Sequence, residues 1–72
     1  MKYKIVFKEM EKNDRILGFH FKVNDEKTAR EAYAEFKKKV EAISAGGRRC
    51  FNVEGLYRID RIDRRAILTK IC

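Results

Sequence analysis

The side chains with the widest chemical range in this sequence are a single histidine, two cysteines and a few carboxylates. General base catalysis by His20 would require an acid or a nucleophile beside it, and the hydroxyl side chains of Thr28, Ser44 and Thr69 are expected to lie far away. We therefore expect His20 to be an exposed strand residue that contributes to binding.

The carboxylates and cysteines do not predict catalysis either. The closely spaced pairs Glu9/Glu11 and Asp60/Asp63 both fall where turns are expected, with no spacing that suggests acid–base work. Two cysteines and one histidine cannot complete a four-ligand zinc site without carboxylates. The sequence thus predicts no catalytic residue, metal or cofactor, and we expect a protein that is not an enzyme.

The basic residues are the strongest functional signal. The chain has 18 Lys and Arg against 11 Asp and Glu, a formal net charge of +7. The expected helix is neutral, so the excess lies on the expected strands and turns, where it is typical of polyanion binding. The residues predicted to contact nucleic acid or a partner are Lys4, His20, Lys22, Arg48, Arg49, Arg58, Arg61, Arg64, Arg65 and Lys70.

Hydrophobic periodicity predicts the elements that position these residues. Alternating apolar residues predict strands over 2–8, 15–23, 50–59 and 64–72. Apolar residues at three- and four-residue steps predict a helix over 25–45.

Short signals mark the ends of these elements. Asn24 or Asp25 can cap the helix start. Gly46-Gly47 is expected to supply a left-handed residue at the helix end, and Asn13-Asp14 is expected to turn the first hairpin.

This order predicts an α+β fold, ββαββ, in one small basic domain over residues 1–72. The third strand should return parallel to the second and pair with the first, which gives a four-stranded antiparallel sheet of order 2-1-3-4 with the helix on one face. The second and fourth strands are then edges, so pairing between copies into a homodimer is open.

Strict alternation assigns side chains to the two faces of this sheet. The rings expected under the helix are Tyr3, Phe7, Phe19, Phe21, Phe51 and Tyr57, with Phe36 of the helix packed on Phe19, Phe21 and Phe51. The residues expected on the open face include the basic Lys4, Lys22, Arg58 and Lys70 and the apolar Val6, Ile16, Leu56 and Leu68. His20 is then the only outward ring, which favours phosphate contacts with little base stacking.

The last hairpin has a predicted register. A loop of Asp60-Arg61-Ile62 pairs Val53 with Thr69 and sets Cys50 opposite Cys72, both expected as reduced thiols. A slip by one residue would bring Lys70 opposite Val53 and place a charge in the core.

These observations favour a non-enzymatic binding module whose open sheet face and Arg-rich loops contact nucleic acid or a nucleic-acid-handling complex. An alternative is an inhibitor that docks on a protein, because phage-encoded inhibitors, anti-CRISPR proteins among them, are similar in size and character.

The opening residues lead into a strand and no apolar run is long enough for a membrane span, so we expect a cytoplasmic protein without a membrane partner.

A third alternative is a metal-independent RNase. The segments KYKIVF, GLYRI and RRAI resemble the first strand and closing hairpin of the RNase toxins of type II toxin–antitoxin systems. That family places two helices after its first strand, where a strand is expected here, so no catalytic residue follows from the resemblance.

Overall fold

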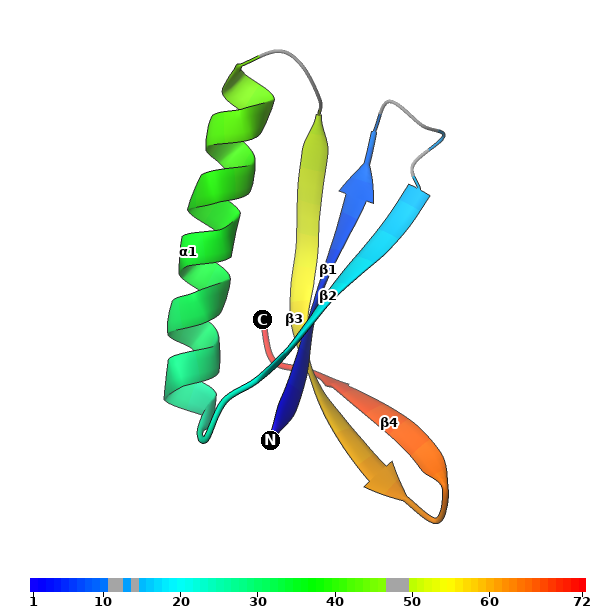
Figure 1. The fold of residues 1–72 in the computed structure, drawn as a ribbon. Helices are drawn as coiled ribbons and strands as arrows, with labels where there is room; N and C mark the ends of the chain where they lie inside the picture. Colours follow the sequence, from blue (N-terminus) through cyan, green and yellow to red (C-terminus); the bar gives the residue numbers. More distant parts are fainter. Residues whose placement is uncertain (11–12, 14, 47–49) are drawn as a thin grey trace.

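The computed structural model describes residues 1–10, 13, 15–46 and 50–72. Its elements are β1 (Lys2–Glu9), β2 (Arg15–Lys22), α1 (Glu26–Ala45), β3 (Phe51–Ile62) and β4 (Arg65–Lys70). They form a four-stranded antiparallel sheet of order β2-β1-β3-β4 with the helix on one face (Figure 1). The predicted ββαββ architecture and strand order are confirmed.

The helix begins where its capping signal predicts. The Asp25 side chain accepts a hydrogen bond of 2.7 Å from the Thr28 backbone N–H, and this bond holds the pKa of Asp25 below its ordinary value. At the other end Gly46 is right-handed, with φ −71°, so it is not the left-handed residue that the pair Gly46-Gly47 was expected to supply. Its N–H instead bonds back to helix carbonyls, and Gly47 lies outside the described residues.

Asn13 in the first connection has φ 56°, the left-handed backbone predicted there, and Asp14 lies outside the described residues. The two strands that it joins pair in an unbroken antiparallel register from Lys2↔Lys22 to Glu9↔Arg15.

A bulge interrupts the pairing of β1 with β3. Val6 pairs with Gly55 and Phe7 pairs with Val53, so Glu54 is an extra residue in β3. Because side chains alternate along a strand, one extra residue moves every later side chain to the opposite face. The strict alternation assumed for this strand is therefore wrong beyond Glu54.

The closing hairpin also differs from the predicted register. Its turn is Asp63-Arg64, and Ile62 pairs with Arg65. Both turn residues have left-handed backbone, with φ 50° and 66°. Two consecutive residues of this kind give a turn whose twist matches that of the strands, so β3 runs on through Asp60-Arg61-Ile62 where a loop was expected.

This register separates the two cysteines. The Cys50 carbonyl accepts from the Met10 N–H at one end of β3, whereas Cys72 lies beside Leu56. Six residues along a strand span about 20 Å, so the predicted juxtaposition of Cys50 and Cys72 is wrong. Both are free and exposed, and Arg30 Nη1 lies 3.4 Å from Cys72 Sγ.

The core lies between α1 and the two central strands. Tyr3, Ile5, Ala29 and Leu56 are fully buried. Phe36 stacks on Phe19 as predicted, with ring centroids 5.4 Å apart. Its second ring contact is with Phe7 at 5.3 Å. The contacts expected with Phe21 and Phe51 are not among its ring contacts, because Phe21 stacks on Tyr3 and Phe19, and Phe51 meets Phe7 edge-on.

The helix covers only part of its side of the sheet. It packs mainly on β3, and the β3–β4 hairpin extends past the end of the helix (Figure 1). As a result Ile62 and Ile67 on this hairpin are 56% and 43% exposed.

Near the C-terminal segment, burial raises the pKa of Tyr33 and negative charge at Cys72 adds to the rise.

A buried carboxylate joins the first two strands. Glu9 is 3% exposed, and its Oε2 accepts a hydrogen bond of 2.7 Å from Arg15 Nη2. We expect Arg15→Ala to lower the free energy of unfolding by about 1–2 kcal/mol, since it removes a charged donor from a buried acceptor but Arg15 itself is largely solvated.

The matched control is Arg30→Ala, which breaks an exposed pair with Glu26 and should cost about 0.5 kcal/mol or less. Urea unfolding measures both values. Equal losses in the two variants would show that the Glu9–Arg15 contact is no stronger than a surface pair.

Candidate functional site

The open face of the sheet, the side away from α1, is defined by two rows of paired side chains. Opposed residues on antiparallel strands share a face, so the register fixes each row across all four strands. The row nearest the chain's first residue is Lys22, Lys2, Ile59 and Leu68. The next row is His20, Lys4, Tyr57 and Lys70, in which rings and cations alternate.

A hollow of about 290 Å³ lies over these rows and over the next open-face pair along β3 and β4. Its lining combines basic and apolar side chains: Lys2, Lys4, His20, Ile59, Arg61, Ala66 and Leu68. Arg61 and Ala66 are paired on the neighbouring strands, so they extend the same face toward the hairpin turn.

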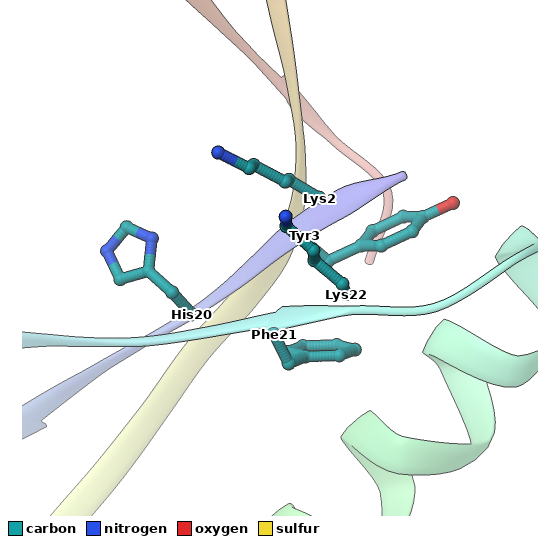
Figure 2. Close-up of a pocket in the computed structure, with 5 residues that line it drawn as sticks. All are labelled: Lys2, Tyr3, His20, Phe21 and Lys22. Carbon is teal, nitrogen blue, oxygen red and sulfur yellow. The ribbon is translucent and has the colours of Figure 1, made fainter.

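A second hollow, of about 240 Å³, adjoins the first beside the paired residues Lys2–Tyr3 of β1 and His20–Lys22 of β2. Figure 2 shows Lys2 and His20 projecting from the side of the sheet away from the helix, whereas Phe21 points toward the helix. His20 and Lys2 line both hollows, so the basic surface is continuous between them.

Most cations of the open face have no acidic partner within the described ranges of the chain. Among the described residues, no ion pair involves Lys2, Lys4, Lys22, Arg61 or Lys70, which we call the open-face cations. The exception on this face is Lys8, whose Nζ lies 3.2 Å from Glu54 Oε1. The open-face cations are therefore available to an external anion.

Two glycines let long side chains lie flat on this face. A Cβ at Gly18 would clash with Lys4 Cε, so the Lys4 stem lies directly over Gly18. A Cβ at Gly55 would come within 2.8 Å of the Cys72 carbonyl oxygen, 3.2 Å of Lys70 Cε and 3.4 Å of a Tyr57 ring carbon. The Tyr57 ring and the Lys70 stem thus lie together over Gly55.

Comparison of the chain with protein-family models, characterised proteins and solved structures found no match. Within residues 1–10, 13, 15–46 and 50–72, no cluster of three His, Cys, Asp or Glu side chains is placed to hold a metal ion. The helix in this part of the chain lacks the apolar length needed to cross a membrane.

Arg58 is a predicted site residue that the structure places on the helix side of the sheet and not on the open face. It pairs with Tyr3, whose side chain is buried under the helix, and its Nε donates to Asp60 Oδ2 over 3.1 Å. The bulge at Glu54 is the physical reason, because it moves Arg58 to the helix side and Tyr57 to the open side. Leu56, expected outward, is fully buried for the same reason.

The other predicted site residues fall into three groups. Lys4, His20, Lys22, Arg61 and Lys70 are brought together on the open face. Arg64 lies in the hairpin turn, and Arg65 pairs with Ile62 on the helix side of β4. Arg48 and Arg49 lie outside the described residues.

Sequence reasoning missed Tyr57 and Ile59, which alternation assigned to the core. A signal for them was present in Gly55, since a glycine inside a strand pattern often marks a bulge. With the bulge included, the open face carries two rings, His20 and Tyr57, and the expectation of a single outward ring is wrong.

Proposed function

We propose that this protein is a non-enzymatic module that binds nucleic acid, alone or within a nucleic-acid-handling complex, through the open face of its sheet. The observation that carries the proposal is the row His20, Lys4, Tyr57 and Lys70, in which two rings alternate with two cations that have no ion pair among the described residues.

The chemistry of this row suits a polynucleotide. Lysine and arginine bind phosphates and displace condensed counterions, while ring faces stack on bases of any sequence. The register puts Lys4 between His20 and Tyr57, so one phosphate and its flanking bases would meet complementary groups. Binding of this kind requires neither a metal nor a catalytic side chain.

The proposal is tested by the salt dependence of binding. We expect a labelled oligonucleotide to bind with log K falling linearly against log salt concentration, with a slope of about −2 to −4 if three to five phosphates are contacted. Fluorescence anisotropy between 50 and 300 mM KCl, about the range where such slopes are measured, gives the value. A flat plot, or no binding at the lowest salt, would refute the proposal.

A second candidate is docking on a protein partner as an inhibitor or adaptor. It is favoured by exposed Ile62 and Ile67 on the helix side of the hairpin, where Arg58 and Arg65 add charge. Apolar and arginine side chains together are common at interface hot spots. A pull-down from lysate with and without nuclease separates the two candidates, because nuclease removes only partners held through nucleic acid.

A further inference from the structure

The open face has a feature that phosphate binding alone does not use. The lining of the larger hollow includes three apolar residues, Ile59, Ala66 and Leu68, which we call its apolar floor, and four basic residues, Lys2, Lys4, Arg61 and His20. Leu68 is 49% exposed, although it lines a hollow on a basic surface. An anion without an apolar part would leave this floor in contact with water.

We infer that the hollow receives an unpaired base and that the module prefers single-stranded to double-stranded nucleic acid. This inference rests on the proposed function and specifies its ligand. A base has an apolar face and is linked to a phosphate, so it matches an apolar floor beside basic side chains.

A duplex does not match the hollow in this way. Its bases are stacked inside the helix, and it presents mainly phosphates and groove edges to a protein. A duplex laid on the open face would contact Lys2, Lys4 and Arg61 but leave Ile59 and Leu68 uncovered. A single strand can turn a base outward onto that floor.

The neighbouring row provides places for the adjoining bases. Tyr57 and His20 lie two strands apart, so their backbones are about 9–10 Å from each other. Lys4 lies between them, and its stem over Gly18 leaves it flat against the sheet. A single-stranded nucleic acid that crosses the sheet would therefore contact the two rings, the cation between them and the apolar floor of the hollow.

Two adjacent residues give a matched pair of variants. Leu68 and Ile67 are both exposed aliphatic residues of β4, at 49% and 43%, but only Leu68 lines the hollow. Leu68→Ser and Ile67→Ser remove similar apolar area from opposite faces of one strand and leave the charge unchanged. Circular dichroism checks that both variants are folded.

The experiment measures binding of dT12, rU12 and the dA12·dT12 duplex by anisotropy at one salt concentration. We expect at least one single strand to bind about tenfold tighter than the duplex. Leu68→Ser should weaken single-strand binding about fivefold without changing the salt slope, while Ile67→Ser should leave it unchanged.

The outcomes separate this inference from the proposed function. No binding of any probe refutes both. Salt-dependent binding in which the duplex is bound as tightly as both single strands overturns the inference and keeps the function. Equal effects of Leu68→Ser and Ile67→Ser also overturn it, because the apolar floor would then have no special part in binding. The dT12 and rU12 arms show whether DNA, RNA or both are bound.

Discussion

Replacing Phe36 by alanine is expected to remove most of the stability of the protein. The Phe36 ring lies between Phe7 and Phe19, with centroid distances of 5.3 and 5.4 Å, and joins α1 to both β1 and β2. Because the ring is partly exposed, the loss is expected at the lower end of the range for Phe→Ala, about 3 kcal/mol. A core of this size rarely supplies more than about 3–5 kcal/mol.

The control for this prediction is Ile43→Ala. Ile43 is on the same helix but is 52% exposed, so its truncation should change the free energy of unfolding by about 0.5 kcal/mol or less. Thermal and urea unfolding followed by circular dichroism measure both variants. A Phe36→Ala protein as stable as Ile43→Ala would contradict the assignment of the helix face.

Reversing two open-face charges is expected to have the second-largest effect. The variant Lys4→Glu/Arg61→Glu removes two of the proposed contacts to phosphate and places acids in the hollow. Binding of single strands should weaken about tenfold or more, and the salt slope should become shallower by about 1.4. The loss should be similar for different sequences, because phosphates carry no sequence information.

Lys27→Glu/Lys38→Glu is the charge-matched control. Both residues are exposed on α1, on the other side of the sheet, and both double variants lower the formal net charge from +7 to +3. If binding depended only on net charge, the two double variants would weaken it equally. A normal salt slope in Lys4→Glu/Arg61→Glu would show that the phosphates are bound elsewhere.

Local patterns in the sequence were sufficient for most of the fold. The helix over residues 26–45 follows from one apolar stripe and the Asp25 cap, both of which depend on near neighbours in the chain. The strand order follows from the short connections and the single crossover. The basic face was predicted for Lys4, His20, Lys22 and Lys70, because β1, β2 and β4 alternate without interruption.

The sequence by itself thus determined the order of the elements, the helix and the sign of the charge on the open face. Only the tertiary structure decided which side chains of β3 share that face, because the bulge at Glu54 depends on how β3 pairs with β1. It also decided the hairpin register. Asp63 and Arg64 both have left-handed backbone, which allows a two-residue turn, but Asp-Arg is not a residue pair that predicts such a turn from the sequence. The combination of Tyr57, Ile59 and Leu68 with the lysines is therefore a property of strand pairing, in which one extra residue reverses the face of every side chain after it.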